Sequence, residues 1–324
     1  MPKPKVFVSR KIPAAGLDKV LAACDAEVWP EQMPPPADVL RRTIADCDGL
    51  LSLLTDRIDG PILDAAPRLK VVSNYAVGFN NLDVPAATHR GVCVGNTPGV
   101  LTDATADMAF ALLIAAARRI VEGQQYTLSG RWKTWEPLGH IGQDLAGRAL
   151  GVVGMGRIGT ALARRCQRGW EMRVLYHDVR PNADAERELG AKLVPFDTLL
   201  AESDFVSVHT DLNDATRGMF NAAAFAKMKP TAVFVNTARG PLVVEHDLAE
   251  ALRTKTIAGA GIDVWEVEPP GKSPLFELDN VIVAPHVAGI DSQARDEMAM
   301  SAARSIVRLF KADWPEAEVV NKEV

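Results

Sequence analysis

The sequence predicts an α/β protein in which parallel strands form sheets that carry helices on both faces. Short apolar runs alternate with helix-like segments along the whole chain, and this repeated order is typical of a parallel sheet. The apolar runs are continuous, as expected for strands that are buried on both faces. A length of 324 residues suggests two domains, with one large domain as the alternative.

The predicted strands are short runs rich in Val, Ile, Leu and Phe. They are 5–9, 49–54, 69–74, 92–96, 150–154, 173–178, 205–210, 232–236, 259–264 and 281–286. Helical patterns lie between them, clearest at 104–120 and 157–168, and a last one covers 292–311. For the long helix near 103–120, Thr102 is the expected N-cap, and Asp103 lies in the first turn, where the helix dipole favours a negative charge.

Two turn-rich stretches mark the expected domain crossings. The first, "GNTPGV" at 95–100, precedes the long helix, and the second, "HVAGID" at 286–291, precedes the last helix. Such stretches are typical of hinges between compact units. We therefore expect the last helix to fold back onto the first domain.

Composition points to a protein of the reducing cytoplasm. Hydrophobic residues make up 48% and charged residues 24%, and the net charge is −5, which argues against nucleic acid or an anionic membrane as partner. The start of the chain has no apolar signal region, and the longest apolar stretch, 108–117, is too short for a membrane span. The cysteines have no disulfide or metal-ligand spacing, so no metal site is predicted; they are Cys24, Cys47, Cys93 and Cys166.

A glycine-rich loop predicts a dinucleotide site. "LGVVGMGRIG" at 150–159 places Gly154, Gly156 and Gly159 between an apolar strand and a helix. The first glycine allows a tight turn, the second lets the backbone approach a pyrophosphate, and the third allows close packing of helix and strand. The pyrophosphate would then lie at the N-terminus of the helix.

The acid at the end of the next strand bears on cofactor choice. Asp178 follows the glycines by about 20 residues, where an acid accepts hydrogen bonds from the adenosine ribose. Its carboxylate repels the 2′-phosphate of NADP(H), so NAD(H) is favoured. Arg180 can pair with that phosphate, and NADP(H) therefore remains the alternative.

Three later strands end in an arginine, an acid and a histidine. "AVFVNTARG" ends at Arg239, "GIDVWEVEPP" runs from Asp263 to Glu268, and "VIVAPH" ends at His286. Because ligands bind beyond the carboxyl ends of parallel strands, we expect these side chains to converge on the cofactor.

Each of these side chains suits the reduction of a 2-keto acid. The guanidinium of Arg239 matches a carboxylate in a two-pronged fork. His286 can give a proton to the ketone oxygen, and a carboxylate on its other nitrogen, assigned to Glu268, would favour the imidazolium and orient the ring. Asp263 is expected to hold the nicotinamide carboxamide. The remaining histidines are interpreted as structural; they are His89, His140, His177, His209 and His246.

Together these motifs resemble the D-isomer-specific 2-hydroxyacid dehydrogenases. "GVVGMGRIG", "NTARG", "GIDVWEVEPP" and "APHVAG" occur in the order and spacing of that family, and the resemblance covers nearly the whole chain. It places the family's catalytic residues on Arg239, Glu268 and His286. It also implies an NAD(P)-dependent enzyme that acts on a small 2-keto acid.

The resemblance further implies two Rossmann-like, doubly wound domains. A discontinuous, flavodoxin-like substrate domain would comprise 1–98 and 288–324, and a dinucleotide-binding domain 99–287. The family is usually a homodimer, in which the long helix and the loop around 132–138 reach the partner.

The implied binding residues extend beyond the motifs. "NYAVGFNNLDV" at 74–84 is similar to the family's substrate loop, so the substrate is expected at Leu53, Val77, Gly78 and Arg239. The expected cofactor residues lie in the glycine loop and at the following strand ends. They are Gly154, Met155, Gly156, Arg157, Ile158, Gly159, Asp178, Thr210, Thr237, Ala238, Asp263 and Gly289.

Within the family, three segments look like glyoxylate and hydroxypyruvate reductases. They are "LLTDRID" at 53–59, "NTPGVLTDATADMAF" at 96–110 and "RWKTWEPLGHIG" at 131–142. The small residues of the substrate loop suit a small keto acid. A larger acid such as 2-ketogluconate is the alternative within the class, and a cofactor-sensing interaction protein is the alternative outside it, since corepressors resemble this family.

Overall fold

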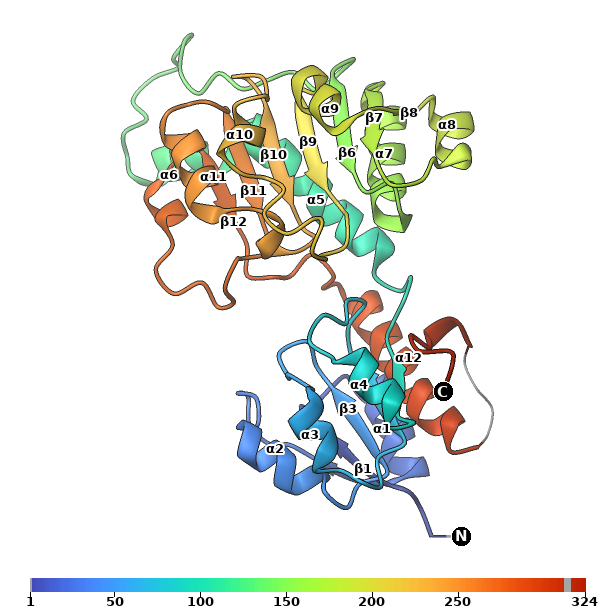
Figure 1. Ribbon diagram of the computed structural model, residues 1–324. Coiled ribbons are helices and arrows are strands. Elements are labelled where there is room, and N and C mark those ends of the chain that lie inside the picture. The colour runs from blue at the N-terminus through green and yellow to red at the C-terminus, as the bar shows by residue number, and fades with distance from the viewer. Residues whose placement is uncertain (1, 312–315) are drawn as a thin grey trace. The chain divides into compact units, whose positions relative to one another are not determined.

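The structure is a computed structural model that describes residues 2–311 and 316–324 (Figure 1). It confirms the predicted α/β class, with two parallel sheets. The chain divides into two compact units: unit 1 comprises Met1–Leu101 and Ile290–Val324, and unit 2 comprises Thr102–Gly289. Met1 and 312–315 fall within the predicted substrate domain but lie outside the described residues.

Unit 1 has a parallel sheet with the strand order β2-β1-β3-β4-β5. This is the flavodoxin-like order, in which the chain reverses direction across the sheet between β1 and β3. Its elements in chain order are β1 (Lys5–Val8), α1 (Ala14–Ala23), β2 (Asp25–Val28), α2 (Ala37–Ile44), β3 (Gly49–Ser52), α3 (Gly60–Asp64), β4 (Val71–Asn74), α4 (Val84–His89), β5 (Cys93–Gly95), α12 (Ser292–Leu309) and η3 (Glu316–Glu318).

Helices cover both faces of the unit 1 sheet. On one face α1 and α12 pack on Val6, Val8 and Leu51, and on the other α2, α3 and α4 pack on Phe7 and Leu50. Successive residues of β1 thus point into different cores, which explains its continuous apolar sequence. As predicted, the last helix belongs to the same unit as the first strands.

Unit 2 has a parallel sheet with the order β12-β11-β10-β9-β6-β7-β8. This is the Rossmann order with one further strand, and its reversal point lies between β6 and β9. Its elements are α5 (Thr102–Ala117), α6 (Ile120–Leu128), β6 (Ala149–Val153), α7 (Arg157–Trp170), β7 (Arg173–His177), α8 (Ala183–Leu189), β8 (Lys192–Leu193), α9 (Phe196–Glu202), β9 (Phe205–Val208), α10 (Ala222–Phe225), β10 (Val233–Asn236), η1 (Gly240–Leu242), α11 (Glu245–Arg253), β11 (Gly259–Ile262), η2 (Pro274–Glu277) and β12 (Val281–Val283).

Two apolar cores lie on the two faces of the unit 2 sheet. Phe234 of β10 joins the core under α9, α10 and α11, whereas Val233 and Val235 join the core under α5 and α7. Figure 1 shows the helices on both faces. The central strands of the sheet are therefore buried, and the loops that carry polar residues begin at their ends.

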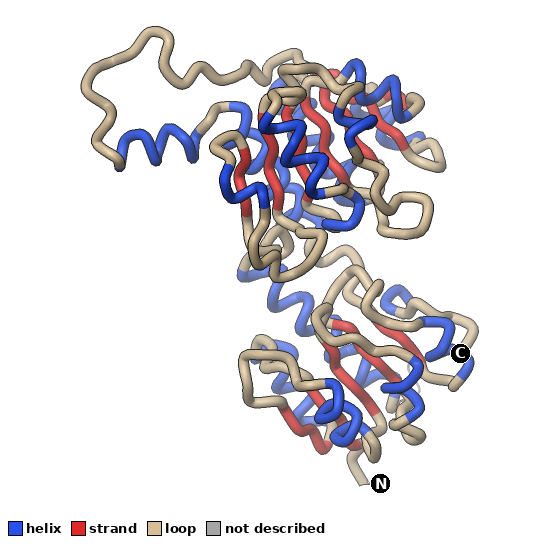
Figure 2. Tube along the Cα trace, turned by 60° about the vertical axis from the view of Figure 1, so that its left-hand side comes forward, coloured by secondary structure: helices blue, strands red, loops and turns tan. Residues whose placement is uncertain are grey.

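The long helix differs from the prediction at both ends. Thr102 is the first helical residue of α5 and not its N-cap. The helix ends at Ala117, and Arg119 takes a left-handed conformation (φ 52°) before α6 begins. Figure 2 shows α6 and the loop that follows it extending from the body of unit 2.

Within residues 2–311 and 316–324, no helix combines the length and the apolar character needed to cross a membrane.

Candidate active site

The predicted cofactor and catalytic residues of unit 2 all follow the carboxyl ends of its parallel strands. The glycine loop follows β6, and Asp178 follows β7. Thr210 follows β9, while Thr237, Ala238 and Arg239 follow β10. Asp263 and Glu268 come after β11, and His286 and Gly289 come after β12. One edge of one sheet thus presents the whole set, as the topology requires.

The glycine loop has the geometry that a pyrophosphate needs. Gly154 has φ +94°, and a Cβ added there would lie 2.6 Å from the backbone nitrogen of Thr210. A Cβ on Gly159 would lie 2.2 Å from the Gly154 carbonyl oxygen, whereas Gly156 faces open space. Two glycines are therefore needed for packing and one leaves room for a ligand, so the loop fits a dinucleotide.

Helix α7 begins directly after this loop without a side-chain cap. Its N-cap residue is Gly156, which has no side chain. The first N–H groups of the helix are therefore not capped by that residue. Such N–H groups, together with the positive end of the helix dipole, bind phosphate. Arg157 and Ile158 form the first turn, next to the expected pyrophosphate.

Asp178 is held against the glycine loop. Its Oδ2 accepts a hydrogen bond from the Met155 N–H at 2.8 Å, and its Oδ1 accepts one from the Arg180 N–H at 3.4 Å. Asn182 completes the support, because its Nδ2 donates to the Met155 carbonyl oxygen at 2.8 Å. Asn182 was not among the residues predicted from the sequence, although Asn is a preferred N-cap residue and Asn182 is the N-cap of α8.

The loop that carries Arg239 is shaped by Asn236. The Asn236 Oδ1 accepts from the Ala238 N–H at 3.0 Å, and its Nδ2 donates to the Arg239 carbonyl oxygen at 2.9 Å. This side-chain turn at the end of β10 was also missed, although Asn after a strand is typical of such turns. A Cβ on Gly240 would lie 1.8 Å from the backbone of Trp265, so the loop packs closely on the segment that leads to Glu268.

Arg239 sits in a largely desolvated environment. Burial lowers the pKa of its guanidinium, and the charges of Glu268 and Asp211 partly offset this effect. An arginine remains charged in spite of such a shift. Arg239, which is half-buried, therefore presents a fixed positive charge at this end of the sheet.

Glu268 and His286 are joined directly. The Nδ1 of His286 lies 2.7 Å from Oε2 of Glu268, and Oε1 accepts from the Trp265 N–H at 3.0 Å. Burial acts to raise the pKa of Glu268, but the hydrogen bond and charge of His286, with smaller contributions from Trp265 and Arg239, leave it below its usual value. The carboxylate is thus ionised and accepts the Nδ1 proton, which leaves Nε2 for other chemistry.

Asp263 holds the turn that carries His286. Its side chain has no exposed surface, and its two oxygens accept from the N–H groups of Val287 and Ala288, each at 2.8 Å. Its carbonyl oxygen accepts from the His286 N–H at 2.8 Å. In this structure Asp263 therefore fixes the turn that carries His286; its contact with the nicotinamide stays a prediction.

The remaining predicted cofactor residues lie around this edge. The Oγ1 of Thr237 is buried and has no hydrogen-bond partner among the described residues, which suits a residue that meets a ligand. Thr210 and Gly289 are half-buried. His209 lies beneath the glycine loop, where its Nε2 is 2.9 Å from the Ser207 Oγ.

The predicted substrate residues of unit 1 also follow strand ends. Leu53 comes after β3, and Val77 and Gly78 lie in the loop after β4, all partly exposed. The described residues contain no group of three or more His, Cys, Asp or Glu that could hold a metal ion.

Comparison with known proteins identifies the family. The sequence model of the D-isomer specific 2-hydroxyacid dehydrogenases, NAD binding domain, matches residues 110–288. The chain belongs to this family. The dehydrogenase is accordingly an NAD(P)-dependent oxidoreductase.

Individual relatives cover the whole dehydrogenase. It is 48% identical over 324 residues to a glyoxylate reductase of Korarchaeum cryptofilum, covering 99% of this chain and 97% of that protein. A solved protein of Thermus thermophilus shares 39% identity, with a TM-score of 0.91 over 98% of this chain and 99% of that chain. The NADPH-dependent glyoxylate/hydroxypyruvate reductase of Sinorhizobium meliloti, solved with NADP and malonate, shares 30% identity, with a TM-score of 0.86 over 98% and 97% of the two chains.

Proposed function

We propose that this dehydrogenase reduces a small 2-keto acid, glyoxylate or hydroxypyruvate, to the D-2-hydroxy acid. The observation that carries the proposal is the 2.7 Å contact between His286 and Glu268, beside the desolvated Arg239. A proton donor, an ionised partner and a cation are the groups that this reduction requires. The 48% identity to a glyoxylate reductase supports the choice of substrate.

In this proposal each side chain has one task. When bound, the reduced nicotinamide supplies a hydride for the ketone carbon. His286 gives its Nε2 proton to the ketone oxygen, and Glu268 stabilises the charged imidazole and holds its ring in place. Arg239 binds and polarises the substrate through its guanidinium fork.

Unit 1 contributes substrate-binding groups in the same proposal. The N–H groups of Val77 and Gly78 donate to the substrate carboxylate, and Leu53 provides an apolar contact. Backbone donors suit this task because they bind an anion without a titratable charge.

The proposed cofactor is NAD(H), held by the glycine loop and the strand ends named above. The support is Asp178, whose carboxylate is fixed at the end of β7 by the Met155 N–H and stands where it would oppose a 2′-phosphate. NADP(H) remains the second candidate, because a solved relative is NADPH-dependent.

We also propose that the enzyme is a homodimer of the cytoplasm. The arm formed by α6 and residues 129–141 exposes several large apolar side chains, and such patches mark protein interfaces. They are Leu128, Trp132, Trp135, Leu138 and Ile141. The four cysteines are free and buried, which is consistent with a reducing compartment.

The proposed function is tested with a substrate panel. Purified enzyme is mixed with NADH or NADPH and with glyoxylate, hydroxypyruvate, pyruvate or 2-ketogluconate, and the absorbance of the reduced cofactor is followed. The expected result is the highest kcat/KM for glyoxylate or hydroxypyruvate with NADH. Tight cofactor binding without turnover of any keto acid would contradict the proposal and favour a cofactor-sensing role.

A further inference from the structure

In the loop after β4, three successive carbonyl groups accept hydrogen bonds. The carbonyl oxygen of Ala76 accepts from the Thr97 N–H at 2.9 Å. That of Val77 accepts from Asn96 Nδ2 at 2.7 Å, and that of Gly78 accepts from Asn74 Nδ2 at 3.0 Å. The donors come from the carboxyl ends of β4 and β5, so each carbonyl is directed towards the sheet.

The direction of these carbonyls determines the direction of the following N–H groups. In a planar trans peptide the C=O of one residue and the N–H of the next point in opposite directions. The N–H groups of Val77, Gly78 and Phe79 are therefore directed away from their anchors. Within the described part of unit 1, none of the three donates a hydrogen bond.

We propose that Asn96 and Asn74 are positioning residues for the substrate carboxylate. They act by orienting the N–H groups of Gly78 and Phe79, which with Val77 form a three-donor anion site that we call the amide nest. Successive backbone N–H groups on one side of a loop bind anions. The role rests on the proposed function, and it adds Phe79 and the two asparagines to the substrate site.

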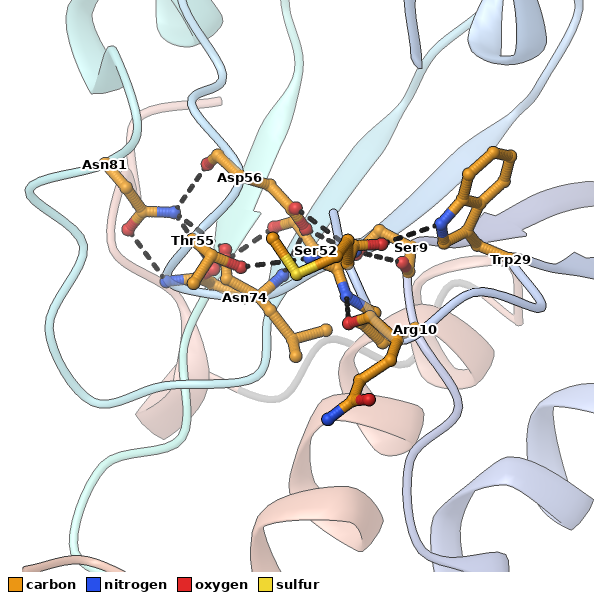
Figure 3. Close-up of polar contacts among 11 residues, drawn as sticks. Ser9, Arg10, Trp29, Ser52, Thr55, Asp56, Asn74 and Asn81 are labelled. Carbon is orange, nitrogen blue, oxygen red and sulfur yellow. Dashed lines mark hydrogen bonds and ion pairs between the residues drawn. The ribbon is translucent and has the colours of Figure 1, made fainter. Parts of the chain in front are cut away.

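A second layer of hydrogen bonds holds Asn74 in place (Figure 3). The Asn74 Oδ1 accepts a hydrogen bond from the Ser52 Oγ at 3.1 Å. The Asn74 Nδ2, which donates to the Gly78 carbonyl oxygen, also donates to the Asn81 Oδ1 at 3.2 Å. Asn81 in turn donates to the carbonyl oxygens of Leu53 and Asp56, at 3.1 and 2.9 Å. The loops after β3 and β4 are thereby joined, so Leu53 and the amide nest are positioned together.

The acidic side chain in this layer, Asp56, contacts Ser9, Arg10 and Leu53. The Asp56 carboxyl is buried, and its Oδ2 accepts from the Leu53 N–H at 2.8 Å and from the Ser9 hydroxyl. The Arg10 guanidinium lies 3.6 Å from its Oδ1. The charge of Asp56 is thus compensated within the layer, and the exposed face of the loop offers donors.

Asn96 is the cleaner position for a test. Among the residues that the structure describes, its side chain makes one hydrogen bond, to the Val77 carbonyl oxygen, and Asn96 is 9% exposed. Asn74, by contrast, also holds Ser52 and Asn81, so its replacement disturbs both loops. Asn96→Leu keeps the volume, removes the donor and adds no charge that would itself repel a carboxylate.

The experiment compares an anionic and a neutral substrate. Steady-state kinetics with NADH are measured for glyoxylate and for glyoxylamide, in which a neutral amide replaces the carboxylate, on wild type, Asn96→Leu and Asn96→Ala. Asn280→Leu is the matched control, because Asn280 also donates its amide to two carbonyl oxygens, of Leu252 and Ala258, but lies at the opposite end of the unit 2 strands. NADH affinity is measured by fluorescence.

The expected result is a loss that is specific for the carboxylate. In both Asn96 variants KM for glyoxylate rises about 10- to 100-fold, as for one or two charge-assisted hydrogen bonds. Their kcat, their NADH affinity and their kcat/KM for glyoxylamide stay within about twofold of wild type. Asn280→Leu keeps the wild-type preference for glyoxylate even where it lowers thermal stability.

Two results would overturn the inference. An unchanged preference for glyoxylate over glyoxylamide in both Asn96 variants, with a normally active wild type, would remove the positioning role and leave the proposed function standing. An equal loss on both substrates would show a structural role only. A wild type that reduces no 2-keto acid would instead overturn the proposed function itself.

Discussion

The Nδ1 of His286 lies 2.7 Å from Oε2 of Glu268, although the two residues come from loops that follow different strands. The Trp265 N–H fixes the second oxygen of the carboxylate. The Asp263 carbonyl oxygen and carboxylate fix the backbone around His286. Glu268 thus holds the imidazole through its Nδ1, and Asp263 holds the backbone that carries the ring.

Replacing Glu268 by Gln tests the charge of this contact. Glu268→Gln keeps the size of the side chain but removes the negative charge that faces the Nδ1 of His286. We expect kcat to fall about 100-fold, within the usual contribution of general acid catalysis, while NADH affinity is unchanged. The measurement is kcat with saturating glyoxylate, and a variant with wild-type kcat would show that the charge is not needed.

Asp178→Asn tests the choice of cofactor. The amide loses the charge that opposes a 2′-phosphate, and it retains an oxygen for the Met155 N–H. We expect the ratio of kcat/KM for NADPH to that for NADH to rise about tenfold or more, a change of about 1.4 kcal/mol. Asp211→Asn is the matched control, because it removes a charge from the neighbouring loop after β9. An unchanged ratio in Asp178→Asn would contradict the role given to Asp178.

The positions of most strands were predicted from the sequence more accurately than the residues at which the strands end. Strands such as 205–210 and 281–286 are observed as Phe205–Val208 and Val281–Val283, because pairing stops before Pro285 and before the polar residues that follow the strands. β2 (Asp25–Val28) was missed since it is an edge strand with two acids and alternating exposure. β8 is only Lys192–Leu193, too short to give an apolar run.

The site was partly predictable for a related reason. Arg239, Glu268 and His286 could be proposed as a group because strand ends and chemical type are both readable from sequence. Their supports were not predicted, since Asn236 and Trp265 act through hydrogen bonds within irregular loops, to residues three positions further along the chain. Such contacts depend on the path of a loop, which apolar periodicity does not report.

The stability of unit 2 should depend on pH through His209. Burial lowers the pKa of His209 to about 4, from an ordinary value of 6.5. Between these values the unfolded chain binds more protons than the folded one, so this contribution to stability is complete above pH 6.5 and is lost as the pH falls towards 4. The expected loss is about 2–3 kcal/mol.

The variant His209→Gln isolates this effect. It keeps a polar group beside Ser207 but cannot take up a proton. We expect the difference in unfolding free energy between pH 7 and pH 4.5, measured in urea, to be smaller than in wild type. His246→Gln is the control, because His246 is exposed. The same pH dependence in wild type and His209→Gln would contradict the assignment.

The exposed arm should carry the dimer contact. The double variant Trp135→Asp and Leu138→Asp places charges at side chains that are 79% and 83% exposed. We expect wild type to sediment with the mass of two chains and the double variant with the mass of one. Met33→Asp, at an apolar residue 73% exposed in unit 1, should sediment as wild type does. A double variant of unchanged mass would place the interface elsewhere.

The most direct test of the account is the rate of the chemical step in His286→Ala. Wild type and variant are loaded with NADH, mixed with saturating glyoxylate, and followed through a single turnover, while NADH binding is measured separately by fluorescence. We expect equal NADH affinity and a rate lowered by about 100- to 10,000-fold, as for the loss of a general acid. A variant that binds NADH normally and reduces glyoxylate at close to the wild-type rate would contradict this expectation.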